Sequence, residues 1–331
     1  MAETNTPPPS DHFDGTSFYN PPSAAPDRAQ TQPRGILPIL RWRLSGERKV
    51  WPPQPPNPTP AGDPQASVAP GTVAVTFIGH STFLLRLPGL TILTDPIFSD
   101  RCSPVSWAGP KRARPPGRAF AALPKIDLLL VSHNHYDHMD LPSLRAIQAR
   151  DAPAVITPLG NAVHLRKAGL GRIHELDWWQ SERLGDSRIT ATPARHFASR
   201  TPWDRNRCLW AGFMIEIGGK KILFGGDSGA GRHWAEISAR LGPTDLALLP
   251  IGAYEPRAIM AAVHINPAEA VAAHRDLMSR QSIGMHFGTF QLTDEAIDAP
   301  PRVLAEVLRA EALDAGCFVT LGFGETRVFT L

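Results

Sequence analysis

The chain has 331 residues, of which 42% are hydrophobic, so it can bury one large core or two smaller ones. Its formal net charge of +3 is small and its basic residues are dispersed, so charge alone gives no reason to expect nucleic-acid binding and stays compatible with an anionic small substrate or a membrane surface. Three widely separated cysteines argue against a disulfide framework and a thiolate zinc site. No apolar run has transmembrane length and no signal peptide is evident, so we expect a cytoplasmic protein.

The first 70 residues differ in composition from the rest of the chain. They carry sixteen of the thirty-four prolines and few apolar clusters. We therefore expect residues 1–70 to form an extension that docks only in part, and residues 71–331 to form the main domain. The short apolar stretch 35–43 has two interpretations, a segment docked on the main domain or a helix at a lipid interface.

From Thr72 onward, short apolar runs alternate with glycine and proline, which indicates regular secondary structure. Asn266, Pro267 and Glu269 are typical of a helix start. Strands are expected at 72–77, 82–87, 91–94, 125–132, 154–157, 172–176, 188–193, 208–217, 221–225, 246–251, 282–286 and 318–321. Helices are expected at 141–149, 162–167, 234–241, 267–278 and 302–313. This order predicts two packed mixed sheets with helices outside.

One short stretch, residues 132–138 with the sequence S-H-N-H-Y-D-H, is dense in metal-binding side chains. His133, His135, Asp137 and His138 lie just after the expected strand 125–132. Adjacent histidine and aspartate side chains would be costly to bury without a metal. With no thiolate nearby, the set predicts a catalytic metal centre that leaves room for water.

Three further side chains of the same kind follow other expected strands, namely His196, Asp227 and His286. Ligands in open α/β sheets gather at the carboxyl ends of strands, so we expect these residues to meet the histidine cluster. The seven side chains suffice for two metals that share one carboxylate, for which Asp227 is the candidate. Two cations about 3.5 to 4 Å apart can activate water and stabilise the attacking and leaving oxygens of a displacement.

Three other polar residues are candidates for supporting roles. His80 and Asp95 end strands, and we expect them to orient the ligands, with turn formation as the alternative for Asp95. His264 stays open between a donor to a substrate phosphate and a hydrogen-bonded core residue.

The ligand set resembles that of the metallo-β-lactamase fold hydrolases. Further stretches resemble one branch, the N-acyl-phosphatidylethanolamine-hydrolysing phospholipase D family, including E-L-D-W-W at 175–179 and P-I-G-A-Y-E-P-R at 250–257. The others are 19–21, 38–42, 93–99, 109–112, 132–138, 264–271 and 286–290. The resemblance implies a four-layer αβ/βα sandwich with a dinuclear zinc site at one edge.

Carried over by position, the resemblance implies one zinc ion on His133, His135 and His196. It implies a second ion on Asp137, His138 and His286, with Asp227 as the bridge. Tyr136 and His264 match residues near the substrate phosphate.

The expected function is phospholipase D type hydrolysis of N-acyl-phosphatidylethanolamine to an N-acylethanolamine and phosphatidic acid. Asp137, Asp227, His264 and Tyr136 are the candidate catalytic residues. The expected partner is a phospholipid, with peripheral contact at the inner membrane face and a homodimer left open. Two alternatives remain: a hydrolase of a soluble phosphodiester or lactone on the same fold, and a metal-binding interaction protein without turnover.

Overall fold

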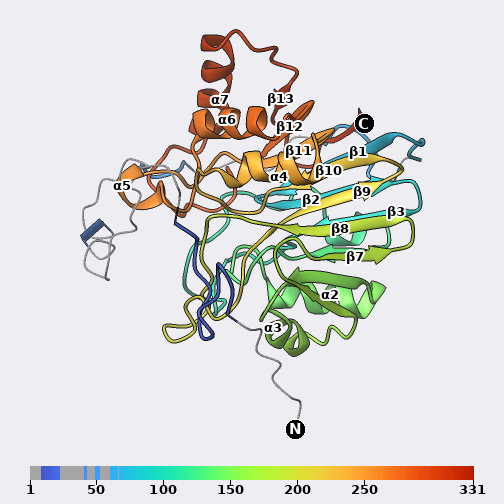
Figure 1. The fold of residues 1–331 in the computed structure, drawn as a ribbon, viewed down its shortest axis with the longest axis vertical. Helices are drawn as coiled ribbons and strands as arrows, with labels where there is room; N and C mark the ends of the chain where they lie inside the picture. Colours follow the sequence, from blue (N-terminus) through green and yellow to red (C-terminus); the bar gives the residue numbers. More distant parts are fainter. Residues whose placement is uncertain (1–8, 23–40, 43–48, 53–59, 66) are drawn as a thin grey trace.

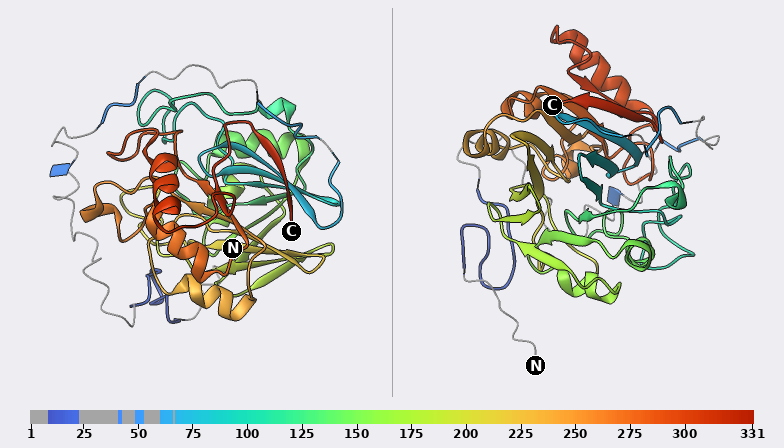
Figure 2. Two further views of the ribbon diagram at one scale, coloured as in Figure 1. Left: turned by 90° about the horizontal axis from the view of Figure 1, so that it is seen from above. Right: turned by 90° about the vertical axis from the view of Figure 1, so that its right-hand side faces the viewer.

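The computed structural model describes residues 9–22, 41–42, 49–52, 60–65 and 67–331. Two seven-stranded sheets dominate this part of the chain, the first strand beginning at Thr72 and the last ending at Thr330. Helices cover the outer faces of the two sheets (Figures 1 and 2). The expected four-layer sandwich of two mixed sheets is therefore confirmed.

The first sheet has the strand order β14-β1-β2-β3-β4-β5-β6. Its β14 to β3 half is antiparallel, and β3 to β6 run parallel. The strands are β1 (Thr72–Gly79), β2 (Thr82–Leu87), β3 (Leu90–Thr94), β4 (Leu128–Leu130), β5 (Ala154–Pro158), β6 (Ile173–Leu176) and β14 (Thr326–Thr330).

The second sheet has the order β13-β12-β11-β10-β9-β8-β7. Strands β10 to β13 are parallel, whereas β7 to β10 form an antiparallel meander. The strands are β7 (Ser181–Leu184), β8 (Ser187–Thr192), β9 (Gly212–Ile217), β10 (Lys220–Phe224), β11 (Leu246–Pro250), β12 (Gln281–Met285) and β13 (Phe318–Val319).

The helices are divided between the two sheets. The short helix η1 (Phe120–Ala122) precedes β4, and the α-helices are α2 (Leu141–Asp151), α3 (Ala162–Lys167), α4 (His233–Leu241), α5 (Arg257–Met260), α6 (Pro267–Asp276) and α7 (Ala299–Ala310). Leu144 of α2 and Leu165 of α3 pack against the outer face of the first sheet. Trp234 of α4 and Val271 of α6 join the core formed with the second sheet.

Strand β4 illustrates why the sandwich forms around the histidine cluster. Leu128 and Leu130 belong to the core between the sheets, and Leu129 points into the layer under α2 and α3. A strand buried on both faces needs a continuous apolar run, and this one has it. Because β4 is buried on both faces, residues 132–138, which follow it, lie at a fixed position at the edge of the first sheet.

Several expected elements differ from the structure at their ends. β4 has three residues in place of the eight expected, and β9 begins at Gly212, not at Cys208. The backbone before β9 bonds to the other sheet instead, because Leu209 N donates to Leu159 O and Ala211 N to Ser132 O. The strands β7 and β14 were not expected, since their short polar sequences lie at or near sheet edges and lack a clear apolar pattern.

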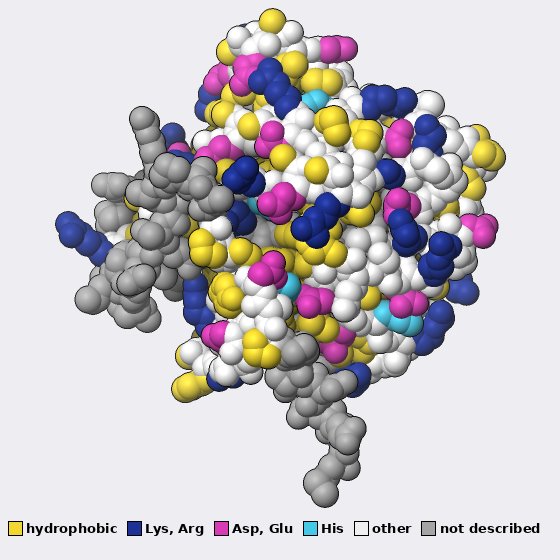
Figure 3. Space-filling model, viewed as in Figure 1, with side chains coloured by type: hydrophobic (Ala, Val, Ile, Leu, Met, Phe, Trp, Pro, Cys, Tyr) yellow, Lys and Arg dark blue, Asp and Glu magenta, His cyan; other side chains and the backbone are white. Residues whose placement is uncertain are grey.

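The N-terminal extension reaches the sandwich at several points. Residues 9–22 dock through Phe13 and Phe18, which are both buried. Of the apolar stretch 35–43, only Arg41 and Trp42 lie within the described residues, and Trp42 Nε1 donates to Asp294 Oδ2 over 2.6 Å. In the described part of the chain, none of the helices has the length and apolarity to cross a bilayer. On the face shown in Figure 3, Lys and Arg side chains are interspersed with Asp and Glu.

Candidate metal centre

A tight turn after β4 gathers the histidine cluster. His138 N donates to His135 O over 3.1 Å, and Met139 N donates to the same oxygen over 2.8 Å. The turn folds the chain back, so that side chains from both of its halves face the same space. The local sequence therefore brings four metal-binding side chains together before any other strand contributes.

Three imidazole nitrogens form the first group of donors. His133 Nε2 lies 2.8 Å from His135 Nδ1, and His196 Nε2 lies 3.2 Å from the same nitrogen. His196 comes from the loop after β8, in the other sheet. These three atoms have the spacing of ligands that could share one cation.

Carboxylate and imidazole groups form the second set. Asp137 Oδ2 lies 3.4 Å from His138 Nε2 and 3.5 Å from His286 Nε2. Asp227 Oδ2 lies 3.1 Å from each of these two nitrogens and 3.8 Å from His196 Nε2. Asp227 therefore stands between the two groups.

Asp227 owes its place to the glycine before it. Gly226 has a φ of +60°, and a Cβ there would lie 3.0 Å from Ala211 O and 3.2 Å from Ser132 Cβ. Only glycine fits this left-handed and crowded position without strain. The turn after β10 thus brings the Asp227 carboxylate close to the loop that follows β4.

Asp95 and His80 contact two of the candidate ligands, His138 and Asp137, through their side chains. Asp95 Oδ2 accepts from His138 Nδ1 over 2.7 Å, while its two oxygens accept from the Ser132 backbone and hydroxyl. His80 Nε2 lies 2.9 Å from Asp137 Oδ2. Asp95, His80 and His286 have positive φ, an uncommon conformation that clusters at functional sites.

The two candidate substrate-facing residues lie at different distances from the centre. His264 Nδ1 is 3.9 Å from Asp227 Oδ2, and its ring lies 5.1 Å from that of His196. Tyr136 is half-buried, and its hydroxyl donates to Arg200 O over 3.0 Å. His264 thus faces the centre, whereas the hydroxyl of Tyr136 is engaged with the loop after β8.

Burial and charge set the protonation of these groups. Burial lowers the pKa of His135 to about 3 and that of His196 to about 4, which leaves both imidazoles neutral. Burial also opposes a charge on His286, but Asp227 and Asp137 outweigh it and raise its pKa to about 9. The pKa of Asp227 is well below its usual value, because charge on His138 and His286 outweighs burial.

The donor set fits a metal site. Among the described residues, Asp227 Oδ1, His138 Nε2 and His286 Nε2 are buried and make no hydrogen bond, although both nitrogens lie 3.1 Å from Asp227 Oδ2. Buried polar atoms normally have a partner, so these three unpartnered atoms in one cluster fit the coordination of a cation. Nitrogen and carboxylate donors without sulfur suit a catalytic zinc or a similar divalent ion.

The structure also brings in residues that sequence reasoning did not assign to the site. The Ser132 hydroxyl donates to Asp95 Oδ2 and lies 2.9 Å from His133 Nδ1. Asn20 contacts the backbone of His196. The similarity of residues 19–21 to a known family was the only sequence signal that pointed toward Asn20.

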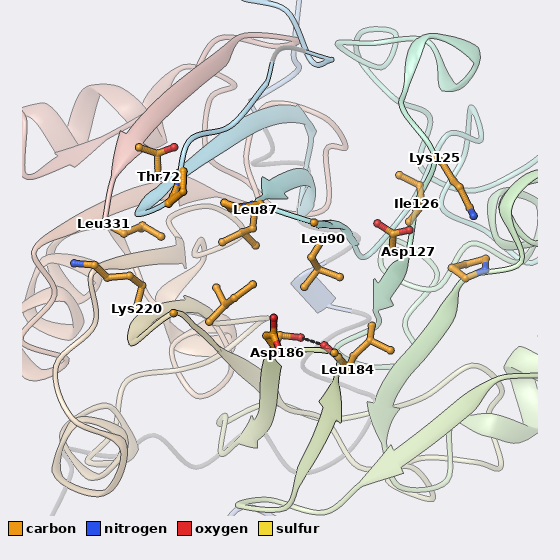
Figure 4. Close-up of a pocket in the computed structure, with 18 of the residues that line it drawn as sticks. Thr72, Leu87, Leu90, Lys125, Ile126, Asp127, Leu184, Asp186, Lys220 and Leu331 are labelled. Carbon is orange, nitrogen blue, oxygen red and sulfur yellow. Dashed lines mark hydrogen bonds between the residues drawn. The ribbon is translucent and has the colours of Figure 1, made fainter.

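A cavity of about 580 Å³ lies at the opposite edge of the sandwich, among the turns after β2, β7 and β9 (Figure 4). Leu87, Leu90 and Leu184 form part of its apolar lining, and Lys125 and Asp186 stand at its rim. None of the candidate metal ligands lines it. A much smaller cavity, of about 10 Å³, touches His80 and His286.

Comparisons with known proteins agree with this geometry. Residues 91–287, more than half of the chain, match the family described as the beta-lactamase superfamily domain. An uncharacterized protein of Mycobacterium tuberculosis is 39% identical over 282 residues, 83% of this chain and 74% of that protein. N-acyl-phosphatidylethanolamine-hydrolyzing phospholipase D 1 of Caenorhabditis elegans is 39% identical over 264 residues, 76% of this chain and 74% of that protein.

A solved structure supports the fold. A metallo hydrolase from Ignicoccus hospitalis superposes with a TM-score of 0.60 at 23% identity, over 78% of this chain and 99% of that chain. Together with the family match and the donor clusters, this shows that the chain belongs to the metallo-β-lactamase superfamily of metal-dependent hydrolases and is related to the N-acyl-phosphatidylethanolamine-hydrolysing phospholipases D.

Proposed function

We propose that this protein is a dinuclear zinc phosphodiesterase that hydrolyses N-acyl-phosphatidylethanolamine to an N-acylethanolamine and phosphatidic acid. The observation that carries the proposal is the convergence of seven donor side chains on two adjoining groups with Asp227 between them. The name of the Caenorhabditis elegans relative supports the choice of substrate.

The distances support a specific assignment of ligands. His133, His135 and His196 would hold one zinc ion, and Asp137, His138 and His286 would hold the other. Asp227 would bridge them. When bound, two zinc ions supply Lewis acidity for activating water and positive charge for neutralising phosphoryl oxygens.

The protein's own groups orient this centre and the substrate. Asp95 holds Nδ1 of His138, which leaves Nε2 of that residue directed at the carboxylates. His196 Nδ1 donates to Val263 O over 3.0 Å and thereby directs its Nε2 inward. His264 would place an imidazole beside the phosphate. We also propose that residues 71–331 form the catalytic domain and residues 1–70 an extension docked on it.

Two exposed tryptophans, in the segments that follow Asp95 and His196 in the sequence, favour a lipid surface over a soluble substrate. Trp107 is 79% exposed and Trp203 is 85% exposed. Trp107 lies in the segment between β3 and β4, and Trp203 lies in the loop after β8 that also carries His196. Indole rings partition to bilayer interfaces, so we propose peripheral contact with the inner membrane face there.

The basic residues between β3 and β4 contribute less to membrane attraction than their number suggests. Arg112 donates to Ser99 O and Ile97 O over 2.9 and 2.8 Å, and Arg118 donates to Gly324 O over 2.8 Å. These guanidinium groups position the loop. Lys111 in the same loop is exposed.

The test is an assay of purified protein on vesicles that contain N-acyl-phosphatidylethanolamine. We expect phosphatidic acid and an N-acylethanolamine in equal amounts, loss of both products with a chelator, and recovery with zinc. Asp227→Ala should lower the rate by more than about 100-fold, since it removes the shared ligand. Asp186→Ala, at the opposite edge, is the matched control.

The alternatives give different results in the same preparation. Turnover of a soluble phosphodiester or a lactone, without phosphatidic acid from vesicles, would contradict the lipid substrate and keep the fold. Stoichiometric zinc with no turnover of any of these substrates would indicate a metal-binding interaction protein. Trp107→Ala with Trp203→Ala should reduce sedimentation with vesicles, whereas Met278→Ala, also exposed, should not.

A further inference from the structure

The N-terminal segment 9–22 lies against the loop that carries His196. Phe18 N donates to Asn206 O over 2.8 Å, and Arg207 Nη1 donates to Thr16 O over 3.1 Å. The Phe13 and Phe18 rings, 4.5 Å apart, are buried and belong to the largest hydrophobic cluster of the described residues. The segment is therefore anchored to the loop after β8 by both apolar and backbone contacts.

A second anchor fixes the start of the segment. His12 stacks on Trp178 with ring centroids 4.2 Å apart, and its Nε2 lies 2.7 Å from Asp177 Oδ1. These two partners belong to the stretch E-L-D-W-W at 175–179 and lie between β6 and β7. The segment is thus held at both ends.

Asn20 makes the contact of interest. Its Nδ2 donates to His196 O over 2.8 Å, and its Oδ1 accepts from His196 N over 3.2 Å. One carboxamide thereby satisfies both backbone groups of a single residue, as a neighbouring strand would. Of the uncharged side chains, only an amide carries a donor and an acceptor in this fork, which hydroxyl and apolar groups lack.

Arg195, the residue before His196, contacts both the turn after β10 and the N-terminal segment. Arg195 N donates to Ser228 Oγ over 2.9 Å, and Arg195 Nη1 donates to Pro21 O over 3.2 Å. Ser228 follows Asp227 directly. The backbone of residues 195–196 is therefore clamped between the N-terminal segment and the turn that presents Asp227.

We propose that Asn20 is a positioning residue that fixes His196 for metal binding. The inference rests on the proposed role of His196 as a ligand. Two contacts orient His196: its Nδ1 donates to Val263 O, and its backbone bonds to the side chain of Asn20. In this orientation, His196 Nε2 lies 3.2 Å from His135 Nδ1. Partners outside the donor set typically change metal affinity by about 10- to 100-fold when removed.

The experiment measures zinc retained per chain during a titration with a competing chelator. We expect wild-type protein to hold two ions tightly and Asn20→Ala to release one of them at chelator levels roughly 10- to 100-fold lower. Asn20→Asp keeps the acceptor and loses the donor to His196 O, so it should behave like Asn20→Ala. Tyr19→Phe, which removes an exposed hydrogen bond to Ser10 O in the same segment, is the matched control.

A double-variant cycle separates positioning from general stabilisation. In a His196→Ala background, Asn20→Ala should lower the zinc affinity little further, because both changes act on the same ligand. In a His286→Ala background, Asn20→Ala should lower the zinc affinity by its full amount. Additive effects in both backgrounds, or zinc affinity unchanged in Asn20→Ala, would overturn the proposal. Wild-type protein that binds two ions and cleaves no lipid would overturn the substrate and leave the role of Asn20 standing.

Discussion

Asp95 Oδ2 lies 2.7 Å from His138 Nδ1, and both side chains are fully buried. The same carboxylate also accepts from the backbone N–H and the hydroxyl of Ser132, so three donors share its two oxygens. A strand end of the first sheet is in this way joined to the loop that carries four of the seven candidate ligands.

Asp95→Asn should weaken metal binding although it is nearly isosteric. An amide has only one acceptor oxygen, so its NH₂ group would face either the Ser132 N–H or His138 Nδ1. We expect zinc affinity to fall by about 10- to 100-fold, with kcat/KM recovering in part at high zinc. Asp100→Asn, an exposed carboxylate in the same segment, should have no effect. Equal zinc affinities in the two variants would contradict the orienting role.

Removing the metal should destabilise the fold. The buried centre holds acidic and imidazole groups that lose their compensation when a cation leaves. A ligand present at about 100 times its dissociation constant contributes about 2.7 kcal/mol to the free energy of unfolding. We therefore expect thermal unfolding to begin several degrees lower in chelator and to recover with added zinc. A melting temperature that does not depend on zinc concentration would show that metal binding and folding are uncoupled.

The docking of the N-terminal segment should depend on pH through His12. Burial lowers the pKa of this imidazole, but hydrogen bonds and charges from Asp177 and Asp11 outweigh burial and raise it above 6.5. A raised pKa means that the folded state binds the proton more tightly than the unfolded state. The stabilisation from protonated His12 is therefore complete below the pKa of the unfolded state and is lost as the pH rises through the pKa of the folded state. His12→Gln should therefore cost more stability at about pH 5.5 than at about pH 8.5.

Urea unfolding of the wild type and His12→Gln at the two pH values measures this difference, which we expect to be on the order of 1 kcal/mol. His174→Gln, at a half-exposed histidine elsewhere in the chain, is the control. A gap between wild type and His12→Gln that is constant with pH would mean that stacking on Trp178, and not charge, anchors the segment.

The N-terminal cap of α6, a helix that begins close to His264, should contribute to the free energy of unfolding. The Asn266 side chain accepts from Glu269 N and the Glu269 side chain accepts from Asn266 N, both over 2.9 Å. Glu269 also pairs with Arg257, whose guanidinium donates to His264 O over 2.9 Å. Asn266→Ala should lower the free energy of unfolding by about 1 kcal/mol, and Asn266→Ser should retain most of it. Equal urea midpoints for all three proteins would contradict this.

Much of the fold followed from the sequence, since most strands and helices lie within a few residues of their expected positions. The errors share a cause. The strands β7 and β14 have polar sequences, and residues 208–211 bond to the other sheet although their pattern is that of a strand. The hydrophobic pattern of a segment indicates which of its faces is buried. It does not indicate which strand or sheet the segment bonds to.

The sequence by itself determined the chemistry of the centre, because donor type is a property of each residue and H-x-H-x-D-H places four donors within one turn of chain. Only the tertiary structure decided which atoms face each other. Asp227 stands 3.1 Å from His138 and His286 because two sheets end at one edge. Asn20 reaches His196 across 176 positions because the buried Phe13 and Phe18 fix the path of the segment. Such long-range contacts arise from packing, which local sequence patterns do not encode.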